Sequence, residues 1–158
     1  MTPNIKSIST KNLVGMKMTM SLADYKVDKL WKSFMPRRKE IENAWTDELI
    51  SMSVYDASHF TDFTPTREFE KWAAIEVEDF ENVPREMDRF VLPGGLYAVF
   101  HYKGLSSDNS VYRYIFGTWI PASGFVLDNR PHFEVLGAKY KNNDPESEEE
   151  IWIPIRHK

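Results

Sequence analysis

The sequence predicts an α+β fold, a two-layer sandwich in which a duplicated βαββ unit is arranged with pseudo-twofold symmetry around a central cleft. Three observations support this prediction. Apolar residues alternate along several short segments, as in strands, and recur with helical spacing along two longer ones. These segments follow one another in the same order in both halves of the chain. Short stretches of the two halves also resemble each other residue by residue.

The first half of the chain predicts a strand, a helix and two further strands. Residues Leu13–Met20 alternate in the manner of a strand. Ser21 is expected to begin a helix and Pro36 to end it. One helix face is formed, at spacings of three and four, by Val27, Leu30, Trp31 and Phe34. Segments Leu49–Tyr55 and Phe69–Val77 complete the unit as strands.

The second half predicts the same order of elements. Leu96–Lys103 is expected to form a strand after a turn at Pro93-Gly94-Gly95. Ser106 begins a polar stretch that can cap a helix, which then ends at Pro121 and Gly124. The last two predicted strands are Phe133–Tyr140 and Glu150–Ile155.

The two halves also match in residue type. Leu30–Pro36 aligns with Ile115–Pro121 at a shift of 85 residues, and Glu70–Ile75 aligns with Glu150–Ile155 at a shift of 80. We therefore predict internal repeats at about 11–80 and 84–156 within one domain that spans residues 1–158. Chance similarity between amphipathic segments is the alternative interpretation.

Composition narrows the function. The chain has 158 residues, a net charge of −4 and no cysteine, which excludes disulfides, thiolate nucleophiles and cysteine zinc sites. An acidic protein lacks the basic surface expected for direct nucleic-acid or membrane-surface binding. No apolar run approaches the roughly 20 residues of a membrane span, and the first residues lack a signal-peptide core. We expect a cytoplasmic protein without a cofactor, and without a metal because no two histidines have ligand spacing on one element.

Strand periodicity places two glutamates and two tryptophans at the predicted cleft. Ile151, Ile153 and Ile155 share one face of the last strand and are expected to pack on the helices. Glu150 and Trp152 then point to the opposite face, towards the cleft. By the repeat, Glu70 and Trp72 point there from the first half. A carboxylate beside indole rings suits a cationic ligand, whereas a solvated glutamate beside a core tryptophan is the alternative.

Several segments in order resemble the GyrI-like family, the effector-binding domains of AraC-type and MerR-type multidrug regulators. The matching segments are Leu30–Arg37, Leu96–Gly104, Ile115–Pro121, Pro131–Glu134 and Asp144–Ile155. The resemblance covers nearly the whole chain. It implies a duplicated βαββ unit with a central cleft that binds a lipophilic, often cationic or aromatic, small molecule for sensing or sequestration.

The resemblance also implies roles for particular residues. The glutamate that opens the last strand recognises the cation, and here that residue is Glu150. The expected ligand-binding set is Glu150, Trp152, Trp72, Glu70, Tyr55 and Tyr140. Residues 1–12 are too few for a helix-turn-helix, so we expect no direct contact with nucleic acid.

Two alternative functions remain open at this point. Free-standing members of the family inhibit DNA gyrase or are implicated in hydrolysing reactive small molecules. A hydrolase would use Glu150 as the general base and Tyr140 as the proton donor. A protein partner, either gyrase or a separate DNA-binding regulator, is compatible with the sequence, and the oligomeric state is left open.

Overall fold

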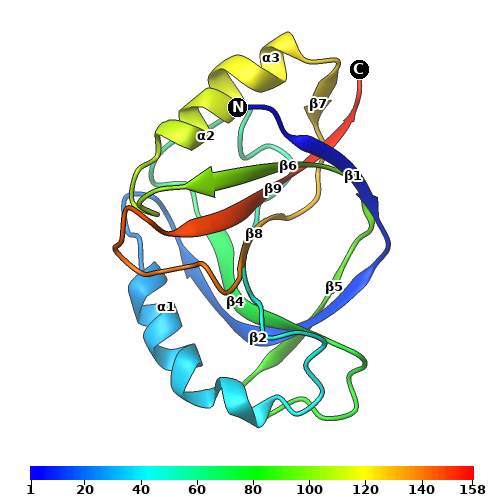
Figure 1. Ribbon diagram of the computed structural model, residues 1–158, viewed down its shortest axis with the longest axis vertical. Coiled ribbons are helices and arrows are strands. Elements are labelled where there is room, and N and C mark those ends of the chain that lie inside the picture. The colour runs from blue at the N-terminus through cyan, green and yellow to red at the C-terminus, as the bar shows by residue number, and fades with distance from the viewer.

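The computed structural model describes residues 1–158 and has mixed α+β architecture, with two helical segments outside a strongly curved antiparallel sheet (Figure 1). The strands are β1 (Asn4–Ile8), β2 (Lys11–Met20), β3 (Leu49–Val54), β4 (Phe69–Val77), β5 (Asp88–Leu92), β6 (Gly95–Lys103), β7 (Phe125–Leu127), β8 (His132–Leu136) and β9 (Glu148–His157). The helical elements are α1 (Val27–Phe34), η1 (Met35–Glu40), α2 (Ser110–Tyr114), η2 (Ile115–Trp119) and α3 (Ile120–Ala122). The predicted α+β class is therefore confirmed.

The strands form one continuous sheet, where two sheets with facing surfaces were expected. The order is β1-β6-β9-β8-β3-β4-β2-β5, and β7 pairs with β9. The two halves join where β3 pairs with β8, with Ile50 opposite Val135 and Met52 opposite Phe133. This pairing satisfies the backbone groups of two strands that would otherwise be exposed edges. The internal duplication itself stays a prediction.

The sheet also closes on itself through two bent segments. β1 and β2 follow each other almost directly, as do β5 and β6. The register Ile8↔Gly95 in one pair continues as Lys11↔Leu92 in the other. At the bend, a Cβ atom on Gly94 would lie 2.6 Å from the carbonyl oxygen of Ile8, so only glycine permits this close approach. The inner face of the sheet is consequently enclosed by its own strands.

Side chains fill this enclosed inner face. The fully buried members of the inner core are Leu13, Ile50, Met52, Trp72, Ala74, Leu92, Tyr97, Val99, Phe133 and Trp152. Phe133 stacks on Trp152 with ring centroids 5.1 Å apart, and Tyr97 meets both rings edge-on. The space in which a central cleft was expected is therefore mostly a packed core.

Two separate cores lie on the outer face, one under each helical segment. Beneath α1, Leu30 and Phe34 pack against strands β2 and β4. Beneath α2 and η2, Val111 and Ile115 pack on the isoleucines of β9, as their periodicity predicted. No helix in this chain is long and apolar enough to span a membrane.

Several element boundaries differ from the sequence prediction. The first helix begins at Val27 because Ser21 closes a tight turn, in which its hydroxyl accepts a 3.0 Å hydrogen bond from the Asp24 amide. The second begins at Ser110, beyond a turn, and then widens into a π-helical stretch. Strand β8 ends at Leu136, and β9 is extended at both ends by pairing with β6 and β7. Strands β1, β5 and β7 were not predicted.

Candidate functional site

A group of polar side chains lies on the outer face of the sheet, between the two outer cores. The central strands β3 and β8 have no helix packed directly on them, and their outward positions are polar. We call this group the polar cluster, and its members are Ser51, Ser53, Lys71, Tyr112, His132, Glu134 and Glu149. They come from β3, β4, α2, β8 and β9. Strand pairing brings them together, since Ser53 lies opposite both Lys71 and His132, and Ser51 lies opposite Glu134.

Glu149 is the most perturbed acid of the polar cluster. Its side chain continues the face of β9 that carries Ile151 and is 6% exposed. Burial, followed by the charge of the neighbouring Glu134, raises the pKa of the Glu149 carboxyl to about 8. Ser106 donates a 3.4 Å hydrogen bond to Oε2 of Glu149. The raised pKa favours the protonated form of this carboxyl at neutral pH.

Tyr112 and Glu134 form a short hydrogen bond across the polar cluster. The Tyr112 hydroxyl on α2 donates to Oε1 of Glu134 on β8 at 2.7 Å. Burial, followed by the charge of Glu134, raises the pKa of Tyr112 well above its ordinary value. The phenol thus remains protonated and keeps donating. This contact ties the second helical segment to the centre of the sheet.

His132 and Lys71 complete the polar part of the site. Burial, followed by the charge of Lys71, lowers the pKa of His132 to about 3, so the imidazole is neutral at pH 7. Lys71 is 6% exposed, and its Nζ donates a 3.0 Å hydrogen bond to Oγ of Ser53. The polar cluster therefore combines two carboxyl groups, one ammonium group and neutral donors and acceptors. No group of three or more His, Asp and Glu side chains is arranged to hold a metal ion.

Aromatic rings cover the polar cluster. We call Tyr55, His59, Phe60 and Phe116 the aromatic cover. Phe60 stacks on Phe116 at 5.6 Å and on His132 at 5.3 Å, and Tyr55 meets His132 edge-on at 5.1 Å. Phe60 nevertheless remains 42% exposed. The aromatic cover thus connects the α2–η2 segment, through Phe116, with the loop after β3, through Phe60. The outer side of these rings is apolar surface, and their inner side faces the buried charges of the polar cluster.

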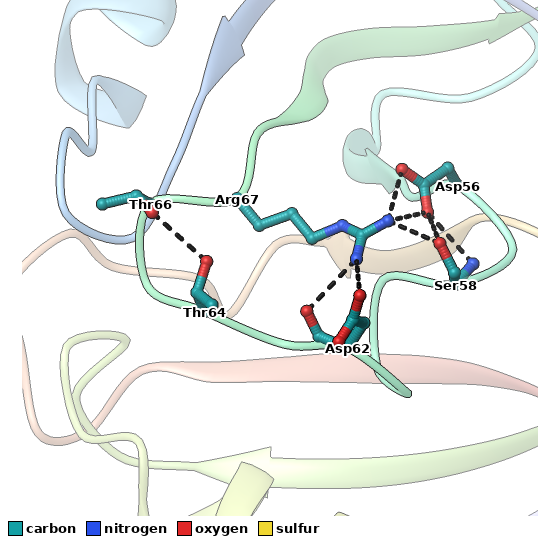
Figure 2. Close-up of polar contacts among 6 residues, drawn as sticks. All are labelled: Asp56, Ser58, Asp62, Thr64, Thr66 and Arg67. Atoms are coloured by element: carbon teal, nitrogen blue, oxygen red, sulfur yellow. Dashed lines mark hydrogen bonds and ion pairs between the residues drawn. The ribbon is translucent and has the colours of Figure 1, made fainter.

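Arg67 fixes the shape of the loop that carries Phe60. Figure 2 shows its guanidinium between Asp56 and Ser58 on one side and Asp62 on the other, all within the loop of residues 56–67. The bonds to the two Asp56 carboxylate oxygens are 2.9 and 3.1 Å long, and the bond to the Asp62 carbonyl oxygen is 3.2 Å long. These charge-assisted hydrogen bonds, both to Asp56 from Nη2 of Arg67, hold the loop in the conformation that places Phe60 on His132.

We expect Arg67→Ala to loosen this loop. Phe60 and Phe63 are exposed chymotrypsin targets, and loss of about 1 kcal/mol of local stability should speed cleavage there about fivefold. The measurement is the rate of limited chymotryptic digestion followed by mass spectrometry. Arg37→Ala is the matched control, because Arg37 makes comparable ion pairs with Glu40 and Glu86 elsewhere on the surface. Equal cleavage rates in the two variants would contradict a fixing role for Arg67.

The structure separates the six residues expected to bind the ligand. Four lie on the inner face. Trp72 and Trp152 are core residues that are 2% and 8% exposed. Each donates its indole N–H to the glutamate two residues earlier in the chain. The distance is 2.7 Å from Trp72 to Glu70 and 3.2 Å from Trp152 to Glu150. Lys17 lies over the Trp72 ring. The expected open cleft with two carboxylates and two free indole faces is therefore not formed, because the rings fill the core.

Glu150 and Trp152 do reach a small pocket at one end of the inner core. Its volume is about 100 Å³, and Lys11, Glu76 and Phe133 are among its other lining residues. Pockets for drug-sized ligands have volumes of roughly 300–1,000 Å³. This pocket therefore suits a few heavy atoms. Binding by Glu150 stays a prediction, and Glu70 and Trp72 do not line the pocket.

Tyr55 and Tyr140 lie on the outer face instead. Tyr55 belongs to the aromatic cover, and burial raises its pKa. Burial also raises the pKa of Tyr140, to which the charges of Glu149 and Glu134 contribute. Both tyrosines therefore flank the polar cluster. Glu150 lines the pocket on the inner face, whereas the pKa of Tyr140 responds to Glu149 and Glu134; their joint role in hydrolysis stays a prediction.

The residues of the polar cluster are not among those predicted from the sequence to bind a ligand. Glu149 continues the face of Ile151, Ile153 and Ile155, which was assigned to the helices. Lys71 likewise continues a buried face, between Phe69 and Ala73. A charged residue that interrupts a buried apolar face is a signal in the sequence, because such a side chain is rarely buried without a partner. Nothing local, however, indicates that the two interruptions meet.

Comparison with known proteins identifies the family. Residues 4–155 match the family model of the integron-associated effector-binding proteins named Cass2. The chain belongs to this family. The resemblance to GyrI-like effector-binding domains is thereby confirmed, while the AraC-type assignment stays a prediction. A curated relative is the transcriptional regulator BrlR of Pseudomonas aeruginosa, 28% identical over 146 residues that cover 91% of this chain. The chain spans about half of that regulator, 52% of its length.

Two solved structures share the fold of this chain. The C-terminal domain of EcmrR superposes with a TM-score of 0.72 at 17% identity, covering 98% of this chain and 97% of that domain. SAV2435 bound to tetraphenylphosphonium superposes with a TM-score of 0.70 at 16% identity, covering 99% and 94% of the two chains. At these identities the likeness establishes the shared α+β fold of this effector-binding family member.

Proposed function

We propose that this effector-binding protein binds a lipophilic organic cation on the outer face of its sheet, with Glu149 as the counter-charge. The observation that carries the proposal is a buried carboxylate within a polar cluster whose His132 is covered by aromatic rings. Ionising Glu149 without a partner is costly, as its raised pKa indicates. A cation that enters the site supplies the missing partner. The rings of Phe60, Phe116 and Tyr55 add cation–π and apolar contact.

The position of the polar cluster supports the same proposal. It lies between two independently packed helical segments, each with its own apolar core. Separation of the segments can widen the site without disturbing the inner core of the sheet. The Phe60 loop is the covering element that has to move, since its ring lies directly on His132 and Phe116. A bound aromatic cation would replace these stacking contacts with its own.

The relatives support this ligand class and a regulatory role. SAV2435 has been solved with tetraphenylphosphonium, an aromatic monocation. BrlR is a transcriptional regulator, and the present chain matches about half of it. We infer that this protein senses or sequesters its ligand. Action through gyrase or through a separate DNA-binding regulator stays a prediction.

The decisive experiment compares two ions of the same shape and opposite charge. Tetraphenylphosphonium and tetraphenylborate both carry four phenyl rings around a central atom, so apolar contact is matched between them. Isothermal titration calorimetry at pH 8.5 should detect the cation and not the anion. Equal affinity for both ions would show that shape alone is recognised and would contradict a role for a carboxylate.

A further inference from the structure

Lys71 is a buried ammonium that the proposed cation site does not require. It lies on β4 between Phe69 and Ala73, on the face that otherwise packs under α1. Its side chain is buried, which is uncommon for a lysine unless it is paired. None of the ion pairs in the structure involves Lys71. Its charge is therefore not neutralised by direct contact with a carboxylate.

The hydrogen bonding of Lys71 is incomplete as well. An ammonium group has three N–H donors, and the hydrogen bond to Oγ of Ser53 uses one of them. His132 lies opposite the same serine and is neutral, so it is an uncharged neighbour. Two donors of Lys71 consequently remain to bind an acceptor.

Lys71 also shares its surroundings with the acids. Its positive charge acts on Glu149, lowering a carboxyl pKa that burial raises, and on Tyr55 in the aromatic cover. One end of the polar cluster thus presents carboxylates from β8 and β9, and the other presents an ammonium from β4. Such an arrangement is complementary to a molecule with both a cationic and an anionic group.

We propose that Lys71 determines ligand specificity by binding an anionic or hydrogen-bond-accepting group of the same molecule whose cationic part lies at Glu149. The inference rests on the proposed function and narrows the expected ligand class from lipophilic cations to molecules that carry both a cationic and an anionic or hydrogen-bond-accepting group. A simple cation leaves Lys71 without a partner and meets its repulsion. An amphoteric ligand satisfies both ends of the polar cluster.

The test uses two phosphonium ions that differ in one terminal group. (4-Carboxybutyl)triphenylphosphonium carries a carboxylate where pentyltriphenylphosphonium carries a methyl group. Calorimetry on the full chain at pH 8.5 should give at least about tenfold tighter binding of the carboxylate compound, as expected for a hydrogen bond to a charged group. Lys71→Met should abolish this preference and strengthen binding of the pentyl compound. Lys71→Arg, which keeps the charge and the donors, should retain part of the preference.

The outcomes separate the two proposals. If Glu149→Gln weakens both phosphonium ions but Lys71→Met leaves their affinity ratio unchanged, the cation site stands and the role of Lys71 is overturned. If Glu149→Gln weakens neither ion, or neither binds the wild type, the proposed function fails and the specificity inference fails with it. Methionine matches the lysine stem in shape, and a thermal melt confirms that each variant is folded.

Discussion

Replacing Glu149 with glutamine should weaken tetraphenylphosphonium binding by at least about 30-fold at pH 8.5. The change removes one negative charge from a buried site and leaves the volume of the side chain nearly unchanged. Truncating one partner of a buried charge pair costs roughly 2–5 kcal/mol, which sets this lower limit. Isothermal titration calorimetry measures the dissociation constants directly.

Glu150→Gln is the matched control, because it makes the same change one residue further along β9. Glu150 points to the inner face and lines the pocket of about 100 Å³, so its substitution should alter affinity by less than about threefold. A larger loss in Glu150→Gln than in Glu149→Gln would place the ligand on the inner face, as the family resemblance predicted. The comparison therefore decides between the two faces of the sheet.

The lower affinity expected for Glu149→Gln should not result from unfolding of the variant. The pKa of Glu149 is raised from 4.5 to about 8, so the folded state holds this proton more tightly than the unfolded chain. The resulting contribution to the free energy of unfolding is complete below pH 4.5 and is lost as pH rises towards 8. Glutamine cannot ionise, so Glu149→Gln should melt at or above the wild-type temperature at pH 8.5.

Affinity for tetraphenylphosphonium should rise steeply between pH 6 and pH 8. The ligand has no titratable group, so the pH dependence arises from the protein. With a pKa of about 8, roughly one in a hundred molecules has an ionised Glu149 at pH 6. The apparent dissociation constant should therefore fall by up to about tenfold per pH unit and level off above pH 8.

His132, Tyr112 and Tyr140 should not mask this dependence. His132 has a pKa of about 3 and stays neutral across the range, and burial raises the pKa values of Tyr112 and Tyr140. Titrations of wild type and Glu149→Gln at pH 6, 7, 8 and 9 give the measurement. The variant should be weak and nearly independent of pH. A wild-type affinity that stays constant from pH 6 to 9 would exclude ionisation of Glu149 as the source of binding energy.

The sequence predicts which face of a strand each side chain lies on. It does not predict whether side chains fill the space that the sheet encloses. Periodicity of two placed Ile151, Ile153 and Ile155 under the helix and Trp152 opposite them, as the structure shows. The same alternation of side chains assigned Glu150 to the inner face. Whether that face holds an open cleft or a core depends on how far the sheet curves. That curvature arises where β1 and β2 pair with β6 and β5, segments distant in sequence.

The sequence by itself determined the α+β class, the family resemblance, the main strands and the faces of those strands, because these follow from residue type and local spacing. The tertiary structure alone decided the joining of both halves through β3 and β8, the filling of the inner face and the position of the polar cluster. Lys71, Glu134 and Glu149 each look like isolated interruptions of apolar or mixed segments. They become one site only because pairing of β4, β3, β8 and β9 brings them side by side in a region of low dielectric.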